Sequence, residues 1–232
     1  MARDAKAELA RKGGRARRTR PASNTPAAGN LSGPRAKRAA ERRDAILAAA
    51  LDEFAARGFA AARLDDVARR AGVAKGTIYL HFADKEALFE ELIRIEIGPI
   101  VAALEQASQA DISLRQVADQ LIEVFVRGIF ETRRKDVIRL VITEGPRFPK
   151  LAEFYYREVI SRVLVIIRAL LRRAFERGEL KTDALVRYPQ LLAAPGIVAI
   201  IWSGLFDRFE PIDIRGMMRA HFDVLLDQEG AS

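Results

Sequence analysis

The stretch LDDVARRAGVAKGTIYLHF, residues 64–82, decides the fold of this chain. It predicts two short helices joined by a tight turn at Gly72, because glycine readily takes the positive φ that such a turn needs. Apolar residues four apart mark the packed face of each helix, Val67 with Ala71 and Ile78 with Phe82. The rest of the second helix carries polar groups, at Lys75, Thr77, Tyr79 and His81. A short helix that presents a row of donors suits insertion into a DNA major groove, so the stretch predicts a helix-turn-helix.

From Arg43 to Leu92 the sequence resembles the TetR/AcrR family of transcriptional regulators, most specifically in AGVAKGTIYLHFADKEALF, residues 71–89. The resemblance implies an all-α fold, in which an N-terminal three-helix helix-turn-helix domain precedes a helical ligand-binding and dimerisation domain. It also implies which residues meet DNA: Arg43, Lys75, Gly76, Thr77, Tyr79, His81 and Lys85. We add Arg63 to this set as a contact on the phosphate side.

Two positions depart from the family pattern. Where Ser or Thr usually caps the two helices, this chain has Arg63 before the first and Ala74 before the second. Losing such a cap costs about 1 kcal/mol. Those hydroxyls commonly hold phosphates as well, and we expect Arg63 to replace one of the contacts with a charge-assisted one. Asp84 is expected to cap the helix that follows.

Tyr79 and His81 allow a second interpretation. Each either contacts phosphate, as the resemblance implies, or is a half-buried structural residue beneath the recognition helix. No metal site is predicted, because His221 is the only other histidine and lies far along the chain.

Composition narrows the class of protein. The 232 residues can form one large or two modest domains, and half of them are hydrophobic. No apolar run approaches the roughly 20 residues that span a bilayer, and nothing resembles a secretory signal. Cysteine is absent, and so are nucleophile–base sets, phosphate-binding glycine loops and metal clusters. We therefore expect a cytoplasmic protein that is neither an enzyme nor dependent on a cofactor.

Positive charge is concentrated at the N-terminal end. Residues 1–43 hold 13 Lys and Arg against 3 Asp and Glu, a net charge of +10. The whole chain carries +8, so the remainder carries −2. We expect residues 1–37 to form a disordered basic arm, followed by a helix-turn-helix domain over 38–84 and a helical domain over 85–228. The arm either adds phosphate or minor-groove contacts, or is a solubilising tail or a misassigned start.

The remaining pattern is helical throughout. The first helix is expected from about Arg38 to Arg57, with a stop at Gly58. The helix after Asp84 should kink or end at Gly98-Pro99. Further helices are expected over 114–132, 136–144, 151–176, 183–206 and 213–227, the fourth of them interrupted at Pro189 and at Pro195-Gly196.

The second domain shows no sharp ligand motif. Several large side chains are candidates for an apolar pocket, although such residues at helical spacing are more often plain core: Phe125, Ile129, Phe130, Phe154, Tyr155 and Trp202. Glu144 and Arg147 flank a Gly-Pro break and would either orient a polar ligand or form a salt bridge. The last two helices carry more apolar surface than one packed face requires, which favours a homodimer.

The leading hypothesis is a dimeric repressor that reads a palindromic operator in double-stranded DNA. A small, largely apolar effector would release it, and the kinked helix after Asp84 would relay effector occupancy to the recognition helix. The alternative is a non-specific architectural DNA-binding protein that acts through the basic arm.

Overall fold

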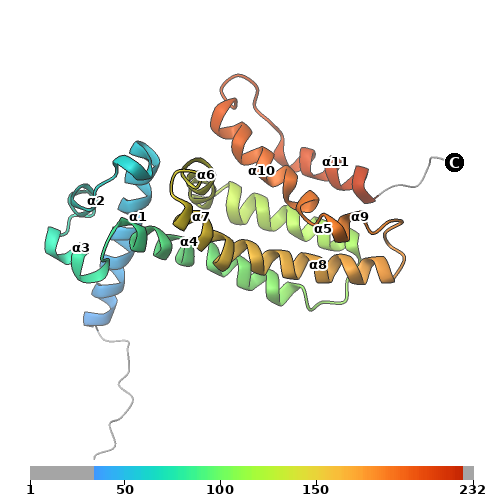
Figure 1. The fold of residues 1–232 in the computed structure, drawn as a ribbon, viewed down its shortest axis with the longest axis horizontal. Coiled ribbons are helices and arrows are strands. Elements are labelled where there is room, and N and C mark those ends of the chain that lie inside the picture. Colours follow the sequence, from blue (N-terminus) through green and yellow to red (C-terminus); the bar gives the residue numbers. More distant parts are fainter. Residues whose placement is uncertain (1–33, 227–232) are drawn as a thin grey trace, which may run out of the picture.

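The computed structural model describes residues 34–226, and the predicted basic arm lies almost wholly outside them. All regular structure in this part of the chain is helical, which confirms the predicted fold class (Figure 1). The N-terminal unit consists of α1 (Pro34–Ala61), α2 (Leu64–Arg70) and α3 (Lys75–His81), and α4 (Lys85–Ala107) leads out of it.

The other helices form an elongated bundle beside this unit, with the α10–α11 hairpin projecting from it (Figure 1). Two segments of the bundle are π-helical, η1 (Val124–Phe130) after α5 and η2 (Tyr156–Ile160) between α7 and α8. The α-helices of the bundle are α5 (Leu114–Glu123), α6 (Arg134–Glu144), α7 (Pro149–Tyr155), α8 (Ser161–Glu176), α9 (Ala184–Arg187), α10 (Gln190–Leu205) and α11 (Ile214–Leu226).

Local sequence signals shape the N-terminal unit as expected. Gly58 breaks the helical path of α1 at φ 73° and ψ 162°, and Gly72 makes the turn between α2 and α3 at φ 67°. The side chain of Asp84 caps α4 by accepting a hydrogen bond from the amide of Ala87 at 2.7 Å. Neither Arg63 nor Ala74 makes a side-chain cap hydrogen bond.

The helix end that Gly98-Pro99 could have produced is absent, and the interruption expected at Pro195-Gly196 is wrong. α4 continues through Pro99 to Ala107, and α10 runs through Pro195. A proline inside a helix removes one backbone hydrogen bond. In α4 the flanking Ile97 and Val101 are both buried, so packing holds the helix together across the lost bond. The helices expected over 114–132 and 151–176 each contain a π-helical segment instead of continuing as regular α-helix.

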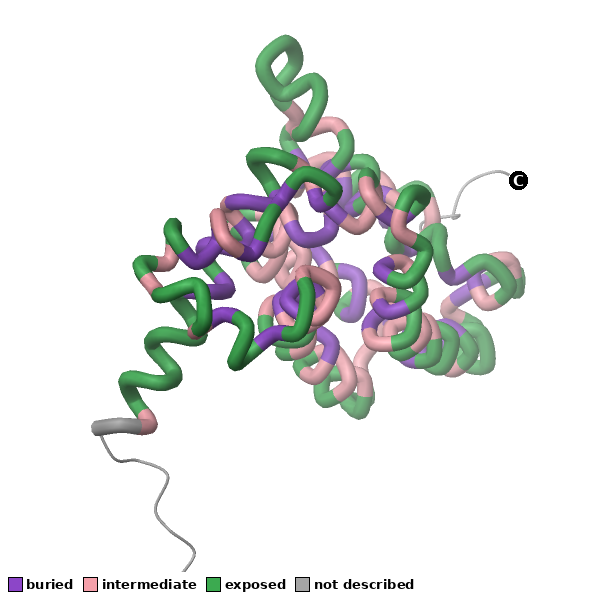
Figure 2. The backbone as a smooth tube through the Cα atoms, turned by 60° about the vertical axis from the view of Figure 1, so that its left-hand side comes forward, coloured by how far each residue is buried: buried purple, intermediate pink, exposed green. Residues whose placement is uncertain are grey.

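Two hydrophobic clusters form the core. The second cluster fills the bundle. The first joins the three-helix unit to α4, α6 and α7, so that Phe54 and Phe89 share a core with Val137 and Phe154. Figure 2 shows that the tip of the projecting hairpin is exposed, in contrast to these buried stretches. The helix-turn-helix unit therefore rests directly on the helices of the bundle.

Candidate nucleic-acid interface

The recognition helix α3 packs through a single buried residue, Ile78. Its polar row is at the surface: Lys75, Gly76, Tyr79 and His81 are exposed, and Thr77 is half-buried. Because His81 is exposed, the alternative of a half-buried structural histidine does not hold. Half of the Tyr79 side chain, 49%, is likewise exposed. The helix thus presents hydrogen-bond donors and acceptors along its free face.

Leu80 is a surface residue of α3 that the sequence analysis missed. It is 84% exposed, more than any other large hydrophobic residue among those the structure describes. Helical periodicity predicts this exposure, because position 80 lies halfway between the buried positions 78 and 82 and so points away from the packed face. In a major groove, an exposed apolar side chain can contact the methyl group of thymine.

The flanking cations differ in their surroundings. Arg63 is exposed and makes no hydrogen bond or ion pair within residues 34–226. Arg43 pairs with Glu91 of α4. The ammonium of Lys85 donates to the carbonyl oxygens of Phe59 and Ala60, both at 2.9 Å, and lies 4.8 Å from the centre of the Phe59 ring. Lys85 therefore closes the end of α1, where carbonyls lack helical partners.

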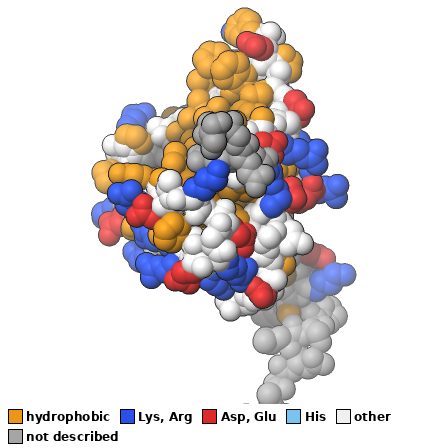
Figure 3. Space-filling model, turned by 90° about the vertical axis from the view of Figure 1, so that its right-hand side faces the viewer, with side chains coloured by type: hydrophobic (Ala, Val, Ile, Leu, Met, Phe, Trp, Pro, Cys, Tyr) orange, Lys and Arg blue, Asp and Glu red, His pale blue; other side chains and the backbone are white. Residues whose placement is uncertain are grey.

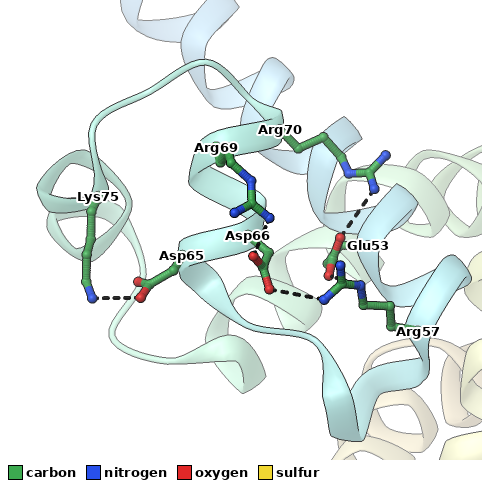
Figure 4. A network of polar contacts seen from close by, with 7 residues as sticks. All are labelled: Glu53, Arg57, Asp65, Asp66, Arg69, Arg70 and Lys75. Carbon is green, nitrogen blue, oxygen red and sulfur yellow. Dashed lines mark hydrogen bonds and ion pairs between the residues drawn. The ribbon is translucent and has the colours of Figure 1, made fainter.

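An ion pair joins the two helices of the helix-turn-helix. Nζ of Lys75, the first residue of α3, lies 2.7 Å from Oδ2 of Asp65 in α2 (Figure 4). The hydrogen bond from Lys75 lowers the pKa of the Asp65 carboxyl below its usual 3.8, and the same bond raises the pKa of Lys75 above 10.5. Both groups are charged near neutral pH.

A buried carboxylate ties α1 to α2. Glu53 is only 1% exposed and pairs with Arg57 at 3.0 Å and with Arg70 at 3.4 Å (Figure 4). Arg57 also contacts Asp66 at 3.3 Å, and Asp66 contacts Arg69 at 2.6 Å. Ion pairs of Glu53 and of Asp66 thus connect α1 to α2.

The bundle contains an apolar cavity of about 180 Å³, lined by α4, η1, η2 and α10 among other helices. Three of the predicted pocket residues line it: Phe125, Ile129 and Tyr155. The other three do not. Phe154 is buried in the first core cluster, the indole of Trp202 donates to the carbonyl of Glu210 at 2.8 Å, and the Phe130 ring faces the ammonium of Lys135 at 4.8 Å.

Tyr155 is the one lining residue with a polar side-chain group. Burial raises the pKa of its phenol to about 12. Both π-helical segments supply lining residues, among them Ile129 from η1 and Val159 from η2. Such segments are rare and frequently occur at functional sites. Glu144 and Arg147 lie outside the cavity lining and form a loose ion pair at 4.0 Å, which agrees with the salt-bridge interpretation.

The α10–α11 hairpin carries an apolar patch, defined by exposed Val198, Ile201, Leu205, Phe206 and Phe209. Figure 3 shows hydrophobic side chains gathered over this projecting part. Ile200 of α10 and Phe222 of α11, by contrast, are buried within the subunit. No helix within residues 34–226 is long and apolar enough to cross a membrane. In the same range, no three His, Cys, Asp or Glu side chains gather in a possible metal site.

Comparison with known proteins gives matches over most of this architecture. Residues 46–92 match the family described as "Bacterial regulatory proteins, tetR family", and residues 103–195 match "AefR-like transcriptional repressor, C-terminal domain". The chain is 32% identical to the transcriptional repressor BepR of Brucella suis over 151 residues, 62% of this chain and 71% of BepR. It is 37% identical to the transcriptional activator FasR of Mycolicibacterium smegmatis over 100 residues, 43% of this chain but only 45% of FasR.

A solved structure shows the same fold. It is that of SmeT, the repressor of a Stenotrophomonas maltophilia multidrug efflux pump, in complex with triclosan. The TM-score is 0.68 at 20% identity, and the match covers 80% of this chain and 90% of that one.

Proposed function

This chain belongs to the TetR family of bacterial regulatory proteins, and from that premise we propose that it is a dimeric repressor released from a palindromic operator by a small, largely apolar effector. It is a DNA-binding transcriptional regulator and not an enzyme. The main support for operator binding is α3, a helix that buries one residue and exposes a row of polar side chains.

In the proposed complex, α3 enters the major groove. Lys75, Thr77 and Tyr79 supply donors, and Leu80 contacts a thymine methyl group. Gly76 lets the backbone approach the DNA, and His81 contacts a phosphate. Arg63 is exposed, makes no hydrogen bond or ion pair among the described residues and contacts the phosphate backbone, as does Arg43 once it leaves Glu91.

The apolar patch on α10 and the following loop supports dimerisation. Several large hydrophobic side chains lie exposed there, and an exposed patch of this kind on a soluble protein marks an interaction site. A two-fold dimer would place two α3 helices on half-sites about 34–36 Å apart.

The cavity supports an effector that is mostly apolar, with one group that hydrogen-bonds to the hydroxyl of Tyr155. α4, α6 and α7 all contribute to the lining, and all share the first core cluster with the helix-turn-helix unit. Occupancy would therefore shift α4 and α6, on which α1 rests, and α1 packs against α2, which in turn contacts α3.

We favour repression because a dimer can block transcription simply by occupying its site, and BepR is itself a repressor. Another relative, FasR, is a transcriptional activator. The place of action is the cytoplasm, where bacterial DNA lies.

The experiment that tests this function selects bound fragments from random duplex DNA at near-physiological salt. It compares the full chain with a version that starts at Arg35, and sedimentation gives the oligomeric state. We expect one palindromic site from both forms and a dimer. Enrichment of no motif, with binding lost on truncation, would establish the architectural alternative. Triclosan, the compound bound by SmeT, serves as the first effector probe.

A further inference from the structure

We propose that Asp65 determines the specificity of the DNA interface through its ion pair with Lys75. The pair holds the Lys75 ammonium where it can contact a base, and it reduces the attraction of that ammonium to phosphates in general. This inference rests on the proposed operator binding through α3. It assigns a function to an acidic residue at a surface where phosphate groups would otherwise favour only cations.

The ammonium of Lys75 is held by Asp65 and remains accessible to DNA. Asp65 lies in the first turn of α2 and Lys75 is the first residue of α3, so their 2.7 Å contact spans the turn of the helix-turn-helix (Figure 4). The Lys75 side chain stays 66% exposed, whereas that of Asp65 is 36% exposed. Nζ also lies 6.0 Å from the centre of the Tyr79 ring, one helical turn along α3. The ammonium is anchored on one side and open on the other.

An anchored ammonium behaves differently from a free one. Lysine carries three N–H donors on a flexible stem, and a free lysine is a mobile point charge that binds any phosphate within reach. With one donor committed to Asp65, two remain, and their directions are restricted. Such a group suits acceptors at fixed positions, above all O6 and N7 of guanine, better than a phosphate on any sequence.

Neighbouring charged residues are not joined to α3 in this way. Arg63 precedes α2, is exposed and makes no ion pair or hydrogen bond between residues 34 and 226. Besides the hydrogen bond from Lys75, the charge of Arg63 helps to lower the pKa of Asp65, but the guanidinium is not held by that carboxylate and can turn to any phosphate. Asp66, next to Asp65, pairs with Arg57 and Arg69 within α1 and α2 and does not touch α3. Only the Asp65 carboxylate reaches the recognition helix among the acidic groups of α2.

The test compares Asp65→Asn with Asp66→Asn, which removes the same charge one residue away. Fluorescence anisotropy gives the dissociation constants for the selected operator and for a scrambled duplex over a range of salt concentrations. For Asp65→Asn we expect tighter binding to scrambled DNA, a salt slope steeper by about 0.9 per subunit, and a specificity ratio lower by about tenfold. Asp66→Asn should leave the specificity ratio unchanged.

Two further variants test whether Asp65 acts through Lys75. In a Lys75→Ala background, Asp65→Asn should have no additional effect on the specificity ratio, because the carboxylate acts through Lys75. Asp65→Ser keeps an oxygen in the first turn of α2 and replaces Asp65→Asn if that variant unfolds. The proposal is overturned if the ratio is unchanged without Asp65, or if Asp66→Asn lowers it equally. A wild-type protein that does not distinguish operator from scrambled DNA would instead overturn the proposed function itself.

Discussion

The carboxylate of Glu144, the last residue of α6, accepts a hydrogen bond from the backbone amide of Phe59 at the end of α1, over 3.3 Å. The Phe59 ring also meets Phe148 edge-on, with ring centres 4.9 Å apart. The helix-turn-helix unit is thus held by the α6–α7 corner, whose other side lines the cavity through Ile138 and Tyr155. A change in the cavity would reach α1 through this corner as well as through α4.

Removing the acceptor should loosen this joint. We expect Glu144→Ala to lower the free energy of unfolding by about 1 kcal/mol, because the Phe59 amide loses its partner in a partly buried site. Glu144→Gln keeps an oxygen acceptor and should cost less. Urea denaturation followed by circular dichroism measures both. Equal midpoints for the two variants would show that the hydrogen bond contributes nothing.

Gly58 should tolerate no side chain. Its backbone, at φ 73° and ψ 162°, is in a region that is essentially restricted to glycine, and a Cβ would lie 2.7 Å from Oε1 of Glu144. Gly58→Ala should therefore destabilise the protein by about 2–3 kcal/mol. Gly72→Ala is the control, since it also has positive φ but nothing within 4 Å of its Cβ. Thermal unfolding should rank Gly58→Ala well below Gly72→Ala, and the reverse order would contradict the steric argument.

Leaving the buried carboxylate of Glu53 unpaired should lower the free energy of unfolding more than removing its charge does. Replacing both arginines, Arg57→Ala with Arg70→Ala, leaves a buried carboxylate without cations and should cost about 3 kcal/mol. Glu53→Gln leaves two half-exposed arginines that water can solvate, so we expect a smaller loss. Chemical denaturation of the two variants tests this order. A larger loss for Glu53→Gln would mean that packing, not charge pairing, dominates at this site.

The Asp65–Lys75 pair should stabilise the fold across a wide pH range. The folded-state pKa of Asp65 is lowered, so its contribution is present above pH 3.8 and is lost as pH falls through the folded value. The folded-state pKa of Lys75 is raised, so its contribution is present below pH 10.5 and is lost as pH rises through the folded value. The stability difference between wild type and Asp65→Asn should stay constant from roughly pH 5 to pH 9 and shrink in acid. A difference that changes with pH near neutrality would contradict this pairing.

Tyr155 should be recognisable by its titration. Ultraviolet difference spectra of the wild type should show a phenol that ionises near pH 12, and Tyr155→Phe should lack it. The same substitution should weaken triclosan binding about fivefold if the hydroxyl bonds the effector, which corresponds to about 1 kcal/mol. Tyr156→Phe, at the exposed neighbouring residue, is the control and should alter neither measurement.

The sequence by itself determined the helix-turn-helix. The turn at Gly72, the cap at Asp84 and the end of α6 before Gly145 all follow from interactions within a few residues, so they can be read from the order of side chains. The position of Leu80 on the free face of α3 follows from helical periodicity in the same way.

Only the tertiary structure decided which distant groups meet. Pro99 and Pro195 remain inside helices because burial of their neighbours outweighs one lost hydrogen bond each. Lys85 turns to the carbonyls of α1, Trp202 turns away from the cavity, and Asp65 reaches Lys75 across the turn. Periodicity shows which face of a helix is apolar, but the partner of that face depends on how whole helices pack together. The contacts that join the DNA-reading unit to the cavity therefore arise only in the folded chain.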